Sequence, residues 1–342
     1  MWTCRLFHVM IAVISLMATG GCGCTNTGGS GRTNYDENSG NTLRIGIQPT
    51  RGALPLWVAK EEGYFAEMGI NVELVTFQSG IEKDAAFQAG TIDGMFSDLV
   101  ASMLLKQQGV PLRIITLICG GRIGEGRVAI VVSPRSSASN LQDLRGKELA
   151  VSPNNIIEFA TDEILKEEGV LPQEVCKVSI PKINVRLSML LENKFTAATL
   201  PEPQATLAQL GGGRIIADDH RNGYLYLVLS MQEKISKPKR SAVVRLLEAL
   251  NRAIEDINEA PWRYRKLLIS VAKISMDHED IVRVARYSSW RVPSEEHVAR
   301  VASWLKDKEL MTQNLSYESL VDASFVQGRR QDSRVPLWLF SF

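Results

Sequence analysis

The spacing of hydrophobic positions along the chain changes repeatedly, and these changes separate predicted strands from predicted helices. Short apolar runs predict buried strands, whereas apolar residues three and four positions apart predict helices. In the first third of the chain, strands are expected at 43–47, 71–77, 92–96 and 112–118, with helices at 55–68, 81–89 and 98–108. This alternation is typical of a doubly wound, mostly parallel α/β sheet.

A second alternating set follows. Strands are expected at 127–132, 148–151, 177–180, 196–200 and 214–217, and helices at 156–168, 185–192 and 204–210. One more strand is expected at 224–230, and residues 238–308 read chiefly as amphipathic helix. One face of the helix at 239–259 carries Val243, Leu246, Leu247, Leu250 and Ile254.

The two sets predict two α/β lobes of similar build with additional C-terminal helices. The chain can cross between lobes in two glycine-rich regions, Cys119–Arg127 and Gly211–Asp219. Two crossings form a hinge, with a cleft between the strand ends of the lobes. We therefore expect the first lobe at 42–122, the second at 123–216, and the completion of the first lobe plus the C-terminal helices at 217–342.

The N-terminus has the pattern of an export signal. The apolar run Leu6–Met17 is shorter than the ~20 residues that span a bilayer, but it suits a signal peptide over residues 1–21. Small residues then precede Cys22, as in lipoproteins, although Thr19 stands where leucine is usual. An ordinary secretory signal is the alternative. Residues 22–41 are mostly Gly, Ser, Thr and Asn, which predicts a flexible linker behind a lipidated Cys22.

Composition and charge argue against a nucleic-acid-binding protein. The chain is 45% hydrophobic and 23% charged, as in ordinary globular proteins, and its formal net charge is +1. Such a neutral balance argues against nucleic acid as a partner. Beyond the linker only Cys119 and Cys176 remain, and we expect two buried thiols there, with a disulfide as the alternative.

Several short segments, in a fixed order, resemble one family of transport proteins. They are Pro55–Phe65, Gly69–Val75, Gln78-Ser79-Gly80, Ala89–Gly94, Leu141–Lys147 and Pro201-Glu202-Pro203. The sequence is similar to the nitrate/taurine (sulfonate, bicarbonate, thiamine-precursor) family of ABC-importer solute-binding proteins. The resemblance implies a type II periplasmic-binding fold, a small-molecule solute, and an ABC permease with its ATPase as partners. It implies a monomer without a cofactor, exported and lipid-anchored to the cell membrane on its periplasmic or outer-surface face.

Ligands of open α/β sheets bind at the C-terminal ends of strands, so the loops there carry the candidate ligand-binding residues. In the first lobe these residues are Thr50, Arg51, Gln78, Ser79, Gly80, Ser97, Asp98, Gly121 and Arg122. The second lobe offers Asn154 and Asn155, and the resemblance adds Glu202 at the cleft. The arginines and helix N-termini suit an anionic group, whereas Asp98 and Glu202 suit an amine.

We expect binding and not catalysis. The sequence has no G-x-S-x-G elbow, no paired-cysteine metal spacing, and four scattered histidines. Thiamine-pyrimidine synthases resemble these binders but carry a cysteine-rich motif, of which this chain has only Cys119. The expected function is a substrate-binding lipoprotein for a small polar solute that is sulfonate/taurine-like, nitrate-like or thiamine-pyrimidine-like. An enzyme of the thiamine-pyrimidine synthase type and a non-transport sensory lipoprotein are the alternatives.

Overall fold

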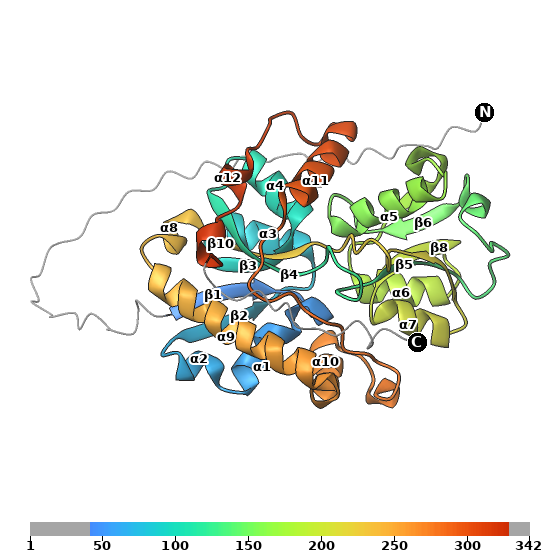
Figure 1. Ribbon diagram of the computed structural model, residues 1–342. Helices are drawn as coiled ribbons and strands as arrows, with labels where there is room; N and C mark the ends of the chain where they lie inside the picture. Colours follow the sequence, from blue (N-terminus) through green and yellow to red (C-terminus); the bar gives the residue numbers. More distant parts are fainter. Residues whose placement is uncertain (1–41, 328–342) are drawn as a thin grey trace, which may run out of the picture. The chain divides into compact units, whose positions relative to one another are not determined.

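Two five-stranded sheets form the framework of residues 42–327, the part of the chain that the computed structural model describes (Figure 1). The predicted signal peptide, Cys22 and the linker at 22–41 lie outside these residues. Within 42–327, no helix is both long and apolar enough to cross a membrane. We call the sheet that begins the chain, with its helices, the first lobe, and the other the second lobe.

The first sheet has the strand order β2-β1-β3-β10-β4. Its strands are β1 (Thr42–Ile47), β2 (Asn71–Thr76), β3 (Gly94–Asp98), β4 (Leu112–Cys119) and β10 (Leu227–Gln232). β1 is parallel to β2 and β3, whereas β10 is antiparallel to β3 and β4 because it returns from the second lobe. β3 and β4 are almost wholly buried, as expected of strands covered by helices on both faces.

Helices cover both faces of this sheet. Figure 1 shows α1 with α2 on one face and α3 with α4 on the other. Their bounds are η2 (Arg51–Ala53), α1 (Leu54–Glu61), α2 (Tyr64–Glu67), α3 (Gly80–Gln88) and α4 (Leu99–Gln107). The single helix predicted at 55–68 is wrong, because Gly63 adopts φ 78° and ends α1 before α2 begins.

The second sheet has the order β7-β6-β8-β5-β9. Its strands are β5 (Val128–Val132), β6 (Glu148–Val151), β7 (Cys176–Ser179), β8 (Ala197–Pro201) and β9 (Arg214–Asp218). β6 is parallel to β7 and β8, and β5 is antiparallel to β8 and β9. The helices of this lobe are α5 (Ile156–Glu167), α6 (Ile183–Leu191) and α7 (Gln204–Leu210), with short turns η3 (Gln142–Leu144) and η4 (Pro172–Glu174).

The chain crosses between lobes twice, at 120–127 between β4 and β5 and at 219–226 between β9 and β10. The second crossing therefore lies later than the predicted Gly211–Asp219. Gly211–Gly213 form instead the turn from α7 to β9, where the Gly213 N–H donates to the Ala208 carbonyl over 2.8 Å. A Cβ on Gly211 would lie 2.5 Å from Leu191, so close packing and not hinge motion accounts for this glycine.

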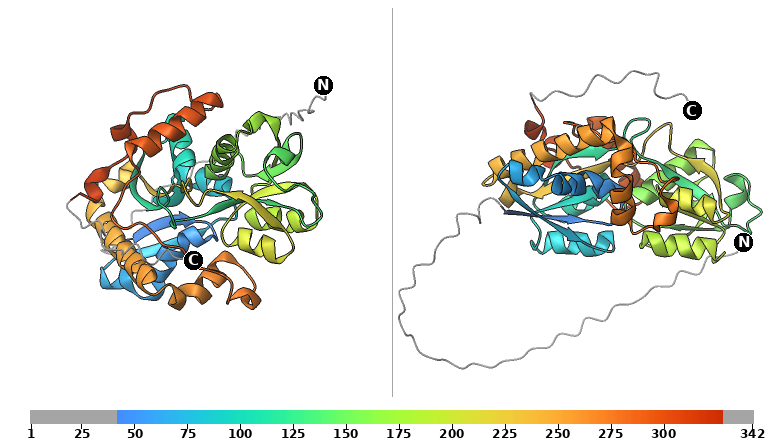
Figure 2. Two further views of the ribbon diagram at one scale, coloured as in Figure 1. Left: turned by 45° about the vertical axis from the view of Figure 1, so that its right-hand side comes forward. Right: turned by 90° about the horizontal axis from the view of Figure 1, so that it is seen from below.

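The C-terminal region returns to the first lobe. It forms α8 (Glu233–Ser236), α9 (Arg240–Glu259), η5 (Pro261–Tyr264), α10 (Arg265–Ala272), η6 (Met276–His278), α11 (Glu295–Asp307), α12 (Tyr317–Leu320) and η7 (Ala323–Phe325). Figure 2 shows α9 lying along α1, which it contacts. The predicted apolar face of α9 is confirmed, since Val243, Leu246, Leu247, Leu250 and Ile254 are all buried.

Residues 279–294 are not helical, contrary to the prediction, and follow the outer edge of β4. The Ser288 N–H donates to the Ile118 carbonyl over 2.7 Å, and the Leu117 N–H donates to the Arg291 carbonyl over 2.6 Å. Backbone groups on a sheet edge need partners, and Ser288 and Arg291 supply them although the segment forms no regular strand.

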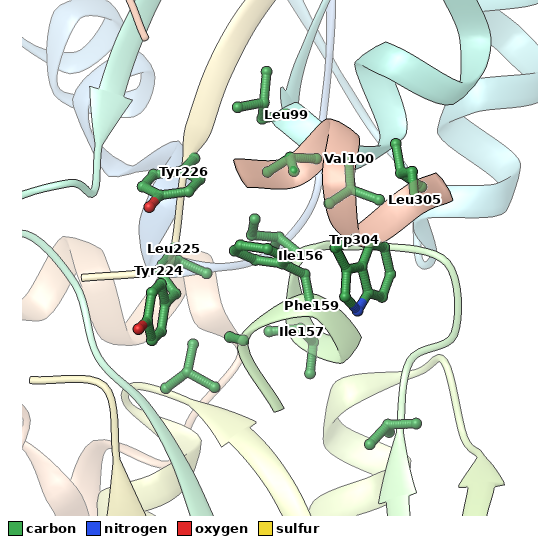
Figure 3. Close-up of a cluster of buried hydrophobic side chains, with 14 of the residues drawn as sticks. Leu99, Val100, Ile156, Ile157, Phe159, Tyr224, Leu225, Tyr226, Trp304 and Leu305 are labelled. Carbon is green, nitrogen blue, oxygen red and sulfur yellow. The ribbon is translucent and has the colours of Figure 1, made fainter. Parts of the chain in front are cut away.

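An apolar core joins the two lobes beside the hinge (Figure 3). Phe159 of α5 packs between Tyr226 of the second crossing and Trp304 of α11, with ring centroids 6.0 Å and 5.7 Å away. Leu99 and Val100 of α4 belong to the same cluster. The cleft is therefore closed off on this side by buried side chains from both lobes.

Candidate ligand-binding site

A cavity of about 460 Å³ lies between the lobes. The first lobe contributes the loops after β1 and β3 and the facing sides of α3 and α4. The second contributes the loops that follow β6, β7 and β8, together with the first turn of α5. Its position at strand C-termini and its size both match the sites of small molecules in α/β folds.

Most of the residues predicted from the sequence come together here. Lining the cavity are Thr50, Arg51, Gly80, Ser97, Asp98, Asn154, Asn155 and Glu202. Four others do not line it: Gln78, Ser79, Gly121 and Arg122. Cys22, the predicted lipidation site, lies outside the described residues.

Local structure explains why those four are elsewhere. Ser79 is the N-cap of α3, and its Oγ accepts from the Glu82 N–H over 3.3 Å. The Gln78 N–H donates to Glu82 Oε2 over 3.2 Å, which completes this helix start. Gly121 packs against the His297 ring, and Arg122 is exposed in the first crossing.

Arg51 is the predicted residue with the clearest capacity to bind an anion. It is only 5% exposed, and its Nη2 atom is buried without a hydrogen-bond partner among residues 42–327. The Tyr287 hydroxyl donates to the Arg51 carbonyl over 2.6 Å and so fixes the backbone at this point. A buried guanidinium nitrogen without an acceptor costs free energy. The charge of Arg51 also opposes the rise that burial causes in the pKa of the Asp219 carboxyl, so an anionic ligand would share this guanidinium with Asp219.

Lys83 is a second cation in the cavity wall, and the sequence interpretation missed it. Its side chain is 2% exposed, and its Nζ donates to Ser97 Oγ over 3.4 Å and lies 3.7 Å from Asp84 Oδ1. Burial raises the pKa of Asp84, while the nearby ammonium of Lys83 opposes that rise. The sequence did contain one indication that Lys83 is buried: it lies one helical turn before Phe87, on the buried face of α3.

Two of the three carboxylates of the cavity wall, Asp98 and Glu202, are already engaged by protein donors. Asp98 caps α4, with Oδ1 accepting from the Ala101 N–H over 2.9 Å. Glu202 accepts from Arg127 Nη1 over 3.1 Å and from Thr206 Oγ1 over 2.8 Å. The prediction that Asp98 and Glu202 bind an amine therefore loses its main support.

Asp98 also links the two lobes. Burial raises its pKa to about 6, against the effects of hydrogen bonds from the backbone amides of Ala101 and Ile156 and of the Lys83 charge. Ile156 begins α5 of the second lobe. The carboxyl of a first-lobe residue thus reaches the N-terminus of a second-lobe helix, which corresponds to a closed arrangement of the cleft.

The second-lobe wall is built from helix starts and apolar side chains. Asn155 caps α5, with Oδ1 accepting from the Ile157 N–H over 3.0 Å, and Asn154 adopts φ 55° before it. The positive end of this 12-residue helix faces the cavity. Apolar lining comes from Ile81, Leu104, Ile157 and Ile183. The cavity therefore combines cations and a helix start with a surface for a hydrocarbon part.

Cysteine and metal chemistry have little support in the described residues. No group of three or more His, Cys, Asp or Glu within 42–327 could hold a metal ion. Burial raises the pKa of the Cys119 thiol to about 12, which makes it a poor nucleophile. Cys119 and Cys176 lie in different sheets and form no disulfide with each other; Cys176 is half-buried and not buried as predicted.

The NMT1/THI5-like family model matches residues 52–263. The chain belongs to this family. The match includes every strand of the two sheets except β1 and extends past α9 into η5, and it confirms the family resemblance predicted from the sequence. No curated protein sequence matches the chain.

Solved structures of similar fold accompany this family assignment. The alkanesulfonate-binding protein SsuA from Xanthomonas axonopodis pv. citri, bound to MOPS, has a TM-score of 0.68 at 17% identity, with 82% of this chain and 98% of that chain covered. The aliphatic sulphonate binding protein SsuA from Escherichia coli gives 0.66 at 15%, covering 80% and 95%. The nitrate-binding protein NrtA from Synechocystis PCC 6803 gives 0.66 at 14%, covering 83% and 87%. These likenesses confirm the predicted two-lobed periplasmic-binding fold.

Proposed function

We propose that the protein is the solute-binding component of an ABC importer and that it binds a small organic anion between its lobes. The observation that carries this proposal is the pair of buried cations, Arg51 and Lys83, in the wall of one cavity. Asp98 and Glu202 accept protein hydrogen bonds, and Lys83 Nζ lies 3.7 Å from Asp84 Oδ1, beyond hydrogen-bond distance, so both cations keep the capacity to bind an anion in the cavity. Family membership and the binding proteins of similar fold support the same function.

The shape and lining of the cavity favour a sulfonate-like solute. A four-atom anion such as nitrate would leave most of a cavity of about 460 Å³ unfilled and the apolar lining without contacts. A flat pyrimidine usually stacks between aromatic rings, and Phe96 is the one aromatic residue among the described lining residues. An anionic head on a short hydrocarbon chain uses both the cations and the isoleucines.

Binding would work by stabilising the closed arrangement. Arg51 and Lys83 lie in the first lobe and the α5 start in the second, so an anion between them contacts both lobes. A ligand with contacts in both lobes favours the closed form, which the permease and its ATPase would then recognise. We propose binding without turnover, since burial suppresses the thiolate form of Cys119.

The cellular setting of the protein is part of this proposal. We propose export by the signal at residues 1–21, lipid anchoring through Cys22, and a flexible linker over 22–41. A monomer held close to the membrane would stay near its permease. Mass spectrometry of the membrane fraction tests the anchor directly, because an N-terminal peptide with diacylated or additionally N-acylated Cys22 is heavier than the same peptide with an unmodified cysteine.

A thermal-shift panel on residues 25–342 tests the solute class. The compounds are propane-1-sulfonate, taurine, nitrate and an aminopyrimidine. A solute at 100 times its Kd adds about 2.7 kcal/mol of stability, or a shift of roughly 5 °C. Arg51→Met should abolish the shift, whereas Arg122→Met, which alters an exposed arginine of the crossing, should keep it. Absence of a shift with every anion would refute the proposed function.

A further inference from the structure

Arg186 of α6 is a fully buried arginine with no acidic partner. Its exposed fraction is 0%. No ion pair of Arg186 with a carboxylate occurs within residues 42–327, and its Nη2 atom has no hydrogen-bond partner in that range. Burial lowers the pKa of Arg186 to about 9, so the guanidinium remains charged at neutral pH. An unpaired buried charge is costly to keep, which calls for an explanation.

The guanidinium ties together three strand ends of the second lobe. Nε donates to the Thr199 carbonyl of β8 over 3.0 Å. Nη1 donates to Ser152 Oγ over 2.7 Å and to the Ile180 carbonyl over 2.6 Å. Ser152 follows β6 and Ile180 follows β7, so one side chain joins the C-terminal ends of three neighbouring strands.

These contacts lie directly behind the cavity wall. Ser152 and Pro181 line the cavity, and the Ser152 hydroxyl donates to the Pro181 carbonyl over 3.2 Å. Ile183, three residues before Arg186 on the same helix, also lines it. The guanidinium is thus separated from the cavity by a single layer of residues, and it fixes that layer through hydrogen bonds.

We propose that Arg186 is a positioning residue of the second-lobe wall and that its uncompensated charge makes closure selective for an anionic solute. The inference rests on the proposed function. Arg51 and Lys83 attract an anion from the first lobe, and Arg186 attracts the same anion from behind the second. A neutral solute of equal shape gains nothing from these charges when the lobes close, because in a low-dielectric interior the interaction scales with the ligand charge.

Matched ligands separate this role of Arg186 from simple structural support. Calorimetry compares propane-1-sulfonate with uncharged propane-1-sulfonamide in the unchanged protein, in Arg186→Gln and in Thr161→Val. Thr161 Oγ1 lies 2.8 Å from Thr199 Oγ1, so Thr161→Val disturbs the same strand end without removing a charge. We expect Arg186→Gln to weaken sulfonate binding roughly tenfold or more and sulfonamide binding less than about threefold. Thr161→Val should leave the sulfonate-to-sulfonamide ratio unchanged.

Hydrogen exchange tests the positioning role without any ligand. In Arg186→Gln, the amides of residues 152–157 and 180–184 should exchange faster than in the unchanged protein. Arg186→Lys keeps a charge and three donors but loses the planar fork, so it serves if the glutamine variant does not fold. It should show faster loop exchange and weaker binding of both probes, with their ratio preserved.

The outcomes are distinct. An unchanged sulfonate-to-sulfonamide ratio in Arg186→Gln overturns the charge selection, and unchanged loop exchange in both Arg186 variants overturns the positioning role. If the unchanged protein does not prefer sulfonate over sulfonamide, the proposed anion-binding function is refuted, and the charge selection by Arg186 is refuted with it.

Discussion

Trp304 Nε1 of α11 donates a hydrogen bond to Asp162 Oδ2 of α5 over 2.9 Å, in a buried position between the two lobes. The indole also stacks edge-on against Phe159. Trp304→Phe keeps most of the ring contact but leaves the Asp162 oxygen without this donor. We expect the free energy of unfolding to fall by about 1–3 kcal/mol in a urea titration. Trp262→Phe, at a position 67% exposed, is the control and should change it little.

The raised pKa of Asp98 predicts a stability that depends on pH. Its carboxyl has a pKa of about 6 in the folded protein and about 3.9 when unfolded, so the folded state binds the proton more tightly. The stability that Asp98 contributes is therefore complete below about pH 4 and is lost as the pH rises through 6. Asp98→Asn stays uncharged and still caps α4.

We expect Asp98→Asn to be more stable than the unchanged protein at pH 7.5 by roughly 1–2 kcal/mol, allowing for solvent screening. Chemical denaturation at pH 7.5, 6 and 4.5 measures the difference, which should shrink as the pH falls. Asp143→Asn is a suitable comparison, because hydrogen bonds from Ser139 lower the pKa of that exposed carboxyl. If Asp98→Asn were instead less stable than the unchanged protein, and increasingly so as the pH rises, the charge of Asp98 would be stabilising.

Gly120 is where the two crossings touch. It adopts φ 105°, and a Cβ there would lie 2.0 Å from the Leu225 carbonyl oxygen. Gly120→Ala should therefore destabilise the protein by more than about 3 kcal/mol, through strain and displacement of the second crossing. Gly109→Ala, at φ 84° with open space around the Cβ, should cost only about 1–2 kcal/mol. Equal melting temperatures of the two variants would contradict this contact.

Lys83 should matter for affinity more than for folding. Lys83→Gln removes a buried charge from the cavity wall but retains a donor toward Ser97. We expect the Kd for propane-1-sulfonate to rise roughly tenfold, as for the loss of one charged hydrogen bond of about 1.4 kcal/mol. Lys166→Gln, which alters an exposed lysine of α5, provides the matched control. Equal affinities of the two variants would exclude Lys83 from the site.

The sequence predicted features that depend on local order. The buried face of α9 was predicted from the spacing of its apolar residues, and the loops after β1, β3, β6 and β8 were placed at one cleft. These predictions follow from helical periodicity and from the common direction of parallel strands. Residues 279–294 could not be predicted in the same way, because their non-helical path depends on hydrogen bonds to the edge of β4, more than 150 positions earlier.

The cations Lys83 and Arg186 were missed for a related reason. Each is a charged residue within a helix, and a charged side chain usually lies in solvent. The burial of these two side chains depends on which distant segments pack over them, and one sequence by itself does not show this tertiary packing. Arg51 was found because it begins the first helical turn after the C-terminal end of β1, where ligands of α/β sheets bind.

The place of β10 between β3 and β4 has a consequence for how the protein acquires its structure. The centre of the first sheet is supplied by residues 227–232, which pair with residues 94–98 and 112–119. Until the chain beyond the second lobe is available, β3 and β4 have no strand between them and cannot form a continuous sheet. Such distant pairing slows folding. The first lobe begins the folded chain but is therefore the last to be completed. In the nascent protein, the first sheet remains incomplete until nearly all residues that line the cleft have been synthesised.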